Sequence, residues 1–202
     1  MRKLSALLVI AALVVGSVLR ADVKLGEIFT DRAVLQRGPA TAVFGTADAG
    51  EVVTVCVATA TANAVADADG RWLLRLNLND VGPGPHSMTV KGAKNEIVLQ
   101  DILVGQVWLC SGQSNMQFGL VSALGGSDEI AQVSNDLLRT FNVSCVGAAE
   151  PAKVLKGSGW QHTIPANRSR TAVGYYFARE LQRELNEPVG YINASWGGSS
   201  IE

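Results

Sequence analysis

The sequence predicts an α/β protein in which an N-terminal antiparallel β-sandwich precedes an incomplete three-layer domain built on a parallel sheet. Residues 23–103 alternate between apolar and polar side chains and contain many Gly, Pro and Asp turns, as in an all-β domain. From residue 104 onward strand-like and helix-like patterns alternate, which favours parallel strands joined by helices. We therefore divide the chain into a signal peptide (1–21), a β-sandwich domain (22–103) and an α/β domain (104–202).

The first 21 residues are predicted to be a secretory signal peptide. Arg2 and Lys3 precede the apolar stretch Leu4–Val15, and Val18–Ala21 offers a candidate cleavage site. The apolar stretch is short for a membrane span, and an N-terminal anchor helix is the alternative. We expect a secreted or periplasmic protein that has no membrane attachment after cleavage.

The β-sandwich is predicted from strands and turns in succession. Glu51–Ala58 is rich in β-branched residues, and Asp69-Gly70 predicts a hairpin between Ala62–Ala68 and Arg71–Leu78. Period-two alternation sends one face of the second arm to the core: Trp72, Leu74, Leu76 and Leu78. Two further strands are expected at His86–Lys91 and Glu96–Gln100.

The α/β domain is predicted from alternating strands and helices. Its strands are expected at Val107–Cys110, at Thr140–Val146, around Trp160 and at Val189–Asn193. Its helices are expected at Asn115–Leu124, at Asp128–Arg139 with Ser127 as the cap, and at Thr171–Asn186. The apolar stripes of the last two helices are Ile130, Val133 and Leu137, and Val173, Phe177, Leu181 and Leu185.

Two segments that follow predicted strands contain the candidate functional residues. Cys110–Phe118 reads C-S-G-Q-S-N-M-Q-F, and a glycine-assisted turn at a strand end lifts the Ser114 side chain above the sheet edge. The second segment, Asn193–Ser200, reads N-A-S-W-G-G-S-S. Because the carboxyl ends of parallel strands share one edge of a sheet, we expect the two segments to meet there.

Together these segments predict a serine esterase. Attack by the Ser114 hydroxyl on an ester creates a negatively charged oxygen, which needs N–H donors. The Ser114 amide can supply one donor, and a glycine amide of the second segment, at Gly197 or Gly198, can supply another. The alternative is that Ser114 only caps the helix that follows it.

Several neighbouring residues have two interpretations. Gln113 is expected to serve the backbone of the turn rather than the substrate, and Asn115 either orients the turn or satisfies the first turn of the helix. Trp160 and Trp196 either stack on a sugar ring or pack in the core, and core packing is favoured for both. We include Gln113 and Asn115 in the candidate oxyanion and substrate site.

The same segments carry a resemblance to a known family. Val107–Met116 (V-W-L-C-S-G-Q-S-N-M) and Gly190–Gly198 (G-Y-I-N-A-S-W-G-G) resemble the sialate O-acetylesterase family of the SGNH-hydrolase superfamily. Ile28–Arg37, Ala66–Trp72 and Ala172–Leu181 resemble it too, so the likeness covers nearly all of the mature chain.

This resemblance implies a β-sandwich followed by a flavodoxin-like esterase domain. The implied activity is the removal of acetyl groups from sugar hydroxyls, on sialic acid or plant polysaccharides. It also implies that Ser114 is the nucleophile and that Gly198, or its neighbour Gly197, donates to the oxyanion.

The sequence departs from the family in two respects that concern catalysis. The family takes its base from an Asp-x-x-His near the C-terminus and a third oxyanion donor, a side-chain amide, from a later strand end, and neither is present here. Of the two histidines, His86 is expected at a turn of the β-region and His162 in the long connection before the last helix, and neither is expected to be catalytic. We therefore expect the N-terminal portion of an exported carbohydrate O-acetylesterase, inactive as this fragment. A non-catalytic carbohydrate-binding or scaffold protein with a relic esterase turn is the alternative.

Composition limits the partners and cofactors. The net charge is −1 and no basic stripe is present, so we expect no nucleic-acid partner. No Cys/His cluster has metal-ligand spacing, and no metal or other cofactor is expected. Cys56, Cys110 and Cys145 are predicted to be buried free thiols. The expected partner is an acetylated carbohydrate.

Overall fold

The computed structural model describes residues 22–152 and 154–199, so the predicted signal peptide lies outside it. The described part folds as a mixed α/β protein with two sheets and four helical segments. No helix in these ranges is long and apolar enough to cross a lipid bilayer. The helical segments are α1 (Ser114–Gln117), the 3-10 helix η1 (Leu120–Ser122), α2 (Gly126–Gln132) and α3 (Ala172–Leu185).

The two sheets differ in size and in strand direction. The smaller sheet is antiparallel and has the order β1 (Lys24–Leu25), β3 (Thr41–Thr46), β6 (Arg71–Leu76). The larger sheet has eight strands and is mixed. Its order is β10 (Gly157–Thr163), β9 (Asn135–Val143), β11 (Val189–Ser195), β8 (Glu96–Gly112), β7 (His86–Lys91), β4 (Val52–Val57), β5 (Ala60–Val65), and β2 (Val34–Gln36) pairs with β8 beside this path.

The core of the β-region lies between the small sheet and the antiparallel half of the large sheet. The inward face predicted for this segment is confirmed. Trp72, Leu74 and Leu76 of β6 and Leu78 just after it are all at most 4% exposed. They pack in one cluster with buried residues of β4 and β7. Burial of this kind stabilises a fold by roughly 1.5–3 kcal/mol for each large apolar side chain.

The predicted hairpin around Asp69-Gly70 is wrong. The turn itself is present, because Asp67 Oδ1 accepts from the amide of Asp69 at 2.9 Å and Gly70 has a φ of +74°. However, β5 and β6 belong to different sheets: β5 pairs with β4, and β6 pairs with β3. The chain therefore crosses from one sheet to the other at this turn, because both arms bury an apolar face against the same core.

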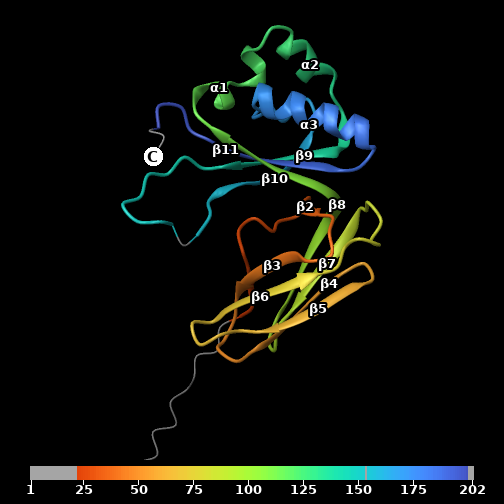
Figure 1. The fold of residues 1–202 in the computed structure, drawn as a ribbon, viewed down its shortest axis with the longest axis vertical. Coiled ribbons are helices and arrows are strands. Elements are labelled where there is room, and N and C mark those ends of the chain that lie inside the picture. Colours follow the sequence, from red (N-terminus) through yellow and green to blue (C-terminus); the bar gives the residue numbers. More distant parts are fainter. Residues whose placement is uncertain (1–21, 153, 200–202) are drawn as a thin grey trace, which may run out of the picture.

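One strand, β8, links the two regions (Figure 1). Its first half pairs antiparallel with β7, and its second half pairs parallel with β11. The predicted strands Glu96–Gln100 and Val107–Cys110 are thus two parts of one strand that passes residue 103. The division at residue 103 into two domains stays a prediction.

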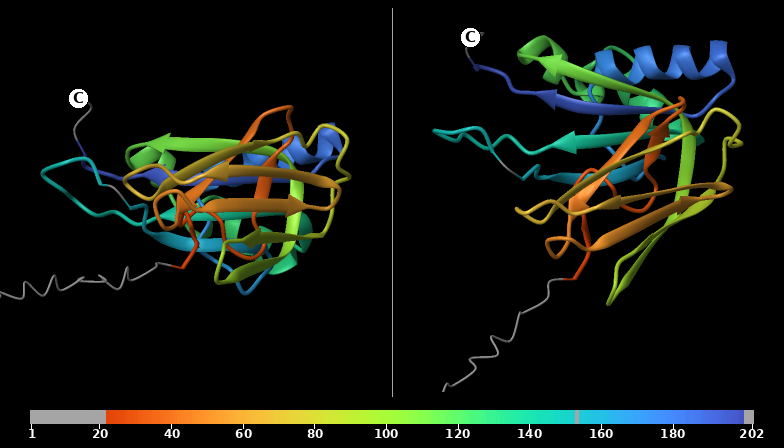
Figure 2. Two further views of the ribbon diagram at one scale, coloured as in Figure 1. Left: turned by 90° about the horizontal axis from the view of Figure 1, so that it is seen from below. Right: turned by 60° about the horizontal axis from the view of Figure 1, so that its bottom comes forward.

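The helices lie on one face of the parallel strands β8, β11 and β9 (Figure 1). The opposite face packs toward the β-region, because Phe141 of β9 and Trp160 of β10 belong to the β-region core. The right-hand view of Figure 2 shows the helices at one end of the molecule and the antiparallel strands at the other. The predicted three-layer arrangement therefore differs from the structure: among the described residues the helices cover one face of these strands, and the β-region packs against the other.

Two of the predicted helices differ from those in the structure. The helix expected at Asp128–Arg139 ends at Gln132, and residues from Asn135 onward form β9. Ser127 lies inside α2, and its N-cap is Gly125. The helix expected at Asn115–Leu124 is divided into α1 and η1.

The apolar stripe predicted for α3 is wrong at three of its four residues. Val173 is 49% exposed, Phe177 43% and Leu185 47%, whereas Leu181 is half-buried against the core under the helix, and the fully buried side consists of small and aromatic residues. That side comprises Ala172, Gly174, Tyr175 and Ala178. Phe177 instead packs edge-on against Trp108 of β8, with ring centroids 5.3 Å apart.

Candidate functional site

Ser114 follows the carboxyl end of β8 and is the first residue of α1. Gly112, with a φ of +150°, begins the turn, and Gln113 occupies the N-cap position without a side-chain capping bond. The Ser114 side chain is exposed and is not the cap. Its amide belongs to the first turn of the helix, where N–H groups have no intrahelical acceptor. A hydroxyl and a free amide therefore face solvent at this strand end.

The second segment meets the first, as the strand directions predict. The Trp196 amide donates to the Gly112 carbonyl at 2.9 Å, and the Ser111 hydroxyl donates to the Ala194 carbonyl at 3.3 Å. The Gln113 carboxamide also donates to the carbonyl of Ser199. Gln113 thus bonds to the backbone of the second segment.

Gly197 is the residue that comes nearest to the serine. A Cβ atom at position 197 would lie 3.5 Å from Ser114 Cβ and 3.4 Å from its Cα. The Gly197 amide donates to Gln117 Oε1 at 2.8 Å, so a side-chain oxygen already occupies it. The next residue, Gly198, has a φ of +79° in the turn closed by Trp196 and Ser199. No hydrogen bond engages the Gly198 amide within the described residues.

A third strand end contributes residues that the sequence patterns did not indicate. Cys145 follows β9; its sulfur lies 3.9 Å from Gln117 Nε2 and 3.7 Å from the Ser195 carbonyl oxygen. The Trp196 ring lies against Gly147 of the same loop. The rule that parallel strands share one carboxyl edge would have placed the segment after β9 here. Gln117 was missed because its role depends on a contact across 80 residues of sequence.

A row of side-chain hydrogen bonds fixes the start of the second segment. Asn193 Nδ2 donates to Asn142 Oδ1 at 3.1 Å, across adjacent strands. Asn193 Oδ1 accepts from the Ser195 hydroxyl at 2.6 Å, and Ser195 is buried. Asn142 Nδ2 donates to the Ser169 carbonyl at 3.0 Å. The turn that contains Gly197 and Gly198 is therefore anchored on two strands and one loop.

Known proteins are similar to this chain in sequence and in fold. No family model matches the chain. It is 32% identical over 189 residues to a sialate O-acetylesterase of Rattus norvegicus, and 30% identical to that of Homo sapiens. The chain is homologous to sialate O-acetylesterases. Each alignment covers 84% of this chain but 35% and 36% of the relative, so the chain spans about a third of their length.

One solved structure is similar in fold as well as in sequence. A crystal structure of a carbohydrate acetylesterase from Xanthomonas citri matches with a TM-score of 0.84 and 37% identity. The match covers 90% of this chain and 42% of that one. The predicted resemblance to the sialate O-acetylesterase family is confirmed as homology, and the roles of the individual site residues stay predictions.

Neither histidine of this sialate O-acetylesterase homologue lies at the serine. His162 of β10 pairs in register with Arg139, the central residue of β9, whereas the site lies beyond the end of that strand. Its Nε2 lies 3.2 Å from Asp101 Oδ2, and its Nδ1 lies 3.8 Å from Asp136 Oδ1. His86 lies in the β-region, with Nε2 2.9 Å from the Gly82 carbonyl oxygen. The described residues therefore supply no histidine base for Ser114.

The His162 contacts belong to an ion cluster at the junction of the two regions. Asp101, with a φ of +59°, binds Arg139 through both oxygens at 3.0 and 3.1 Å. Burial raises the pKa of Asp101, but the bonds and charge of Arg139 outweigh it and lower the pKa overall. Burial, followed by the charge of Arg139, lowers the pKa of His162. This cluster joins β8, β9 and β10 and lies away from the serine.

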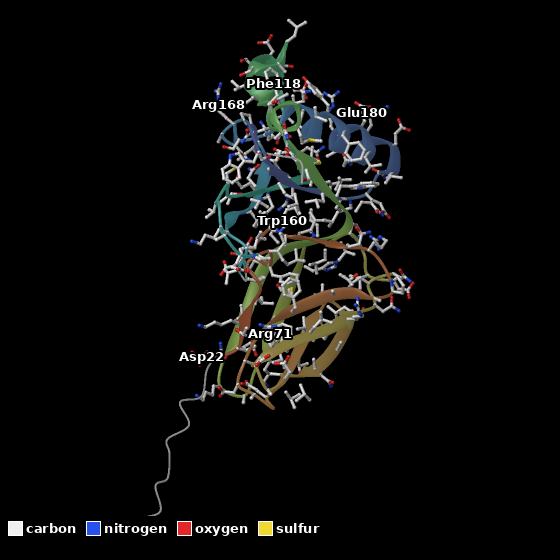
Figure 3. All side chains as sticks on the ribbon, turned by 60° about the vertical axis from the view of Figure 1, so that its left-hand side comes forward. Asp22, Arg71, Phe118, Trp160, Arg168 and Glu180 are labelled. Atoms are coloured by element: carbon white, nitrogen blue, oxygen red, sulfur yellow. The ribbon has the colours of Figure 1, made fainter. Side chains whose placement is uncertain are left out.

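The remaining candidate residues differ in how deeply they are buried. Trp160 is 3% exposed and its Nε1 donates to the Ile28 carbonyl at 2.8 Å, so it packs between the two regions (Figure 3). Trp196 is 44% exposed beside the serine, and Asn115 is exposed on α1. Only Cys110 is a buried thiol, since Cys56 is partly exposed and Cys145 exposed. The described residues contain no group of His, Cys, Asp and Glu side chains arranged to hold a metal.

Proposed function

We propose that this chain carries the nucleophile half of a serine esterase that removes acetyl groups from sugar hydroxyls. Ser114 attacks the acetyl carbon, and the amides of Ser114 and Gly198 stabilise the oxygen that becomes negative. The observation that supports this most directly is the position of Gly197, where an added Cβ would lie 3.5 Å from Ser114 Cβ, so that the two strand-end segments meet at the serine. The acetylated sugar is proposed from the homology to carbohydrate acetylesterases.

Catalysis also needs a base, and the described residues offer none at Ser114. Without a base, a serine retains only the stabilisation that the oxyanion donors and binding provide. We therefore expect the 202-residue chain alone to hydrolyse 4-nitrophenyl acetate or acetylated sugars barely above the buffer rate. The acetyl group would be transferred to Ser114 and then released to water only when a base is supplied.

A chimera tests the proposal. Residues 22–199 would replace the matching part of the Xanthomonas citri acetylesterase, whose remaining 58% (100 minus the 42% covered) would be kept. We expect hydrolysis of acetylated sugars that falls about 10³-fold or more with Ser114→Ala. Ser122→Ala, a change at an exposed serine of η1 outside the two strand-end segments, is the matched control and should retain activity. Equal activity of the Ser114→Ala and Ser122→Ala chimeras would exclude Ser114 as the nucleophile.

A non-catalytic carbohydrate-binding or scaffold protein is the second candidate. The observation that favours it is the position of His162 at the edge opposite to Ser114. This candidate predicts that the wild-type chimera folds, binds acetylated sugar and shows no turnover that depends on Ser114. The same assay therefore separates the two functions.

We also propose that the protein is exported. The support is the sequence of the first 21 residues, with two basic residues before an apolar stretch. N-terminal sequencing of the protein released into the periplasm or medium of a bacterial host should find a chain that begins near residue 22. A chain that stays in the cell and begins with Met1 would contradict export.

A further inference from the structure

Three strands place polar side chains side by side on the helix face of the sheet. Tyr191 of β11, Thr140 of β9 and Gln161 of β10 are register partners, so their side chains leave the same face. It is the face under α3, because Tyr191 packs in one cluster with Tyr175 of that helix. These three residues together with Arg170, which precedes α3, are called here the Arg170 cluster.

Three members of the Arg170 cluster are buried, and its guanidinium lacks most of its protein partners. Arg170 is 2% exposed, Thr140 and Tyr191 are 0% exposed, and Gln161 is half-buried. Within residues 22–152 and 154–199, Arg170 Nε and Nη2 and Gln161 Oε1 make no hydrogen bond, and the Thr140 and Tyr191 hydroxyls have no side-chain partner beyond each other. Arg170 uses only Nη1, which donates to the Ile164 carbonyl at 3.2 Å. Buried polar groups are nearly always bonded, so this concentration on one face indicates a bound partner.

The positive charge of Arg170 is not matched by a carboxylate of its own. Of the described carboxylates, Glu129 acts on it, but Glu129 Oε1 already accepts from the Tyr175 hydroxyl and from Arg179 Nη1 at 2.9 Å. Arg179 pairs with Glu180 at 3.0 Å as well as with Glu129, whereas Arg170 makes no ion pair within the described residues. The Tyr191 phenol stays neutral at physiological pH, because burial raises its pKa to about 12 while a hydrogen bond with the Thr140 hydroxyl lowers it by less. The buried guanidinium of Arg170 is therefore left without an anionic partner of its own.

We propose that the Arg170 cluster binds a small, planar, singly charged oxyanion of the carboxylate class. The Nε–H and Nη2–H edge of Arg170 presents two parallel donors, which match the two oxygens of a carboxylate. The hydroxyls of Thr140 and Tyr191 add donors, and rotation of the Gln161 carboxamide presents its amino group to the same place. Formate and acetate satisfy these requirements in size, shape and charge, whereas water would leave the charge unmatched.

Thermal unfolding of the purified chain tests this site. Wild-type protein is melted in sodium acetate, in sodium formate and in sodium methanesulfonate, whose anion is tetrahedral, at one ionic strength. We expect acetate or formate to raise Tm with the logarithm of its concentration above Kd, by about 3–5 °C at ten times its Kd, relative to methanesulfonate. Arg170→Met should abolish the difference. Arg183→Met, at an exposed arginine of α3, is the matched control and should retain it.

Direct binding covers the case in which Arg170→Met does not fold. The NMR signal of ¹³C-acetate should broaden with wild-type protein and sharpen when formate is added, and Tyr191→Phe should weaken binding. Equal Tm values in the three salts with no broadening would overturn the proposal and leave water in the cluster. The inference does not depend on the esterase activity, because every readout is made without an ester substrate.

Discussion

Ser114 is exposed because Gly112 and Gln113 turn the chain away from the sheet before α1 begins. The second segment reaches it because position 197 has no side chain. The Gln117 carboxamide then holds the Gly197 amide. At the scale of single residues, the site thus depends on the hydroxyl of Ser114, on the absence of a side chain at Gly197 and on the carboxamide of Gln117.

Gly197→Ala should damage this arrangement. The added Cβ would lie 2.8 Å from Gln117 Oε1, so the Gln117 carboxamide has to move and release the Gly197 amide that positions the turn beside the serine. We expect about a 10²-fold loss of hydrolysis by the chimera, because small displacements of reacting groups have effects of this size. Tm should change little, since the turn is at the surface.

Gly125→Ala, at the N-cap of α2 and outside the two strand-end segments, is the matched control for the steric argument. Nothing lies within 4 Å of its added Cβ, but its φ of +71° strains any residue that has a Cβ, by about 1–2 kcal/mol. It should therefore lower Tm more than Gly197→Ala does, and activity less. The reverse order in the activity assay would show that proximity to Ser114 is not what position 197 contributes.

At the scale of elements, strongly patterned strands and the longest helix were predictable, whereas short elements were not. The strand at His86–Lys91 and the helix of residues 172–185 lie where the sequence places them. The helix expected at Asp128–Arg139 fails because Leu138 pairs with Val189 of β11, and a ladder contact to a distant strand outweighs local spacing.

The candidate site shows the same limit. The meeting of the two strand-end segments could be predicted from strand direction alone. The bond between Gln117 and Gly197 could not, because it depends on how a four-residue helix is oriented, and neither could Cys145. The apolar stripe that was predicted to be the buried side of α3 is mostly exposed. Apolar residues spaced by four show that a helix has an apolar face, but they do not tell which of two such faces meets the sheet.

The junction of β8, β9 and β10 should make stability depend on pH. The pKa of His162 in the folded protein lies below the ordinary value of 6.5, so the unfolded chain takes up the proton more readily. This contribution is fully present above pH 6.5 and is lost as the pH falls below it. Asp101, Asp136, Arg139 and Arg32 are the charged groups that act on His162.

Urea unfolding between pH 8 and 5 measures this effect. The midpoint of wild-type protein should fall with pH, and His162→Gln should flatten the fall. His86→Gln, which removes the histidine remote from the junction, should leave the wild-type slope. If all three proteins lose stability in parallel, the dependence arises elsewhere. Asp101 does not interfere in this range, because its pKa is lowered from 3.8.

At the scale of the whole molecule, β8 has an open edge beside the site. Residues 107–112 pair with β11 on one side and, within the described residues, with no strand on the other. Leu109, which is 68% exposed, lies on this edge, on the face opposite to that on which Trp108 packs against Phe177. Unpaired edges with apolar side chains favour association between chains.

Leu109→Lys should therefore reduce self-association of the chain. A charge on an open edge discourages strand pairing, and the position is exposed enough to accept it without a loss of stability. Light scattering coupled to size exclusion should show a smaller average mass at equal concentration. Leu124→Lys, at a fully exposed leucine outside the sheet, is the matched control and should leave the mass unchanged. An equal decrease in both variants would indicate general apolar contact instead of edge pairing.

The continuity of β8 also restricts how this chain can evolve. Successive residues of a strand face opposite sides, so insertion or deletion of one codon between residues 103 and 109 would exchange the faces of all that follows. Cys110 would leave the layer under the helices, and Ser114 would turn away from Gly197 while the β-region kept its register. Length variation between homologues should therefore be confined to the loops, and the spacing from Ile102 to Ser114 should stay fixed at twelve positions (114 minus 102).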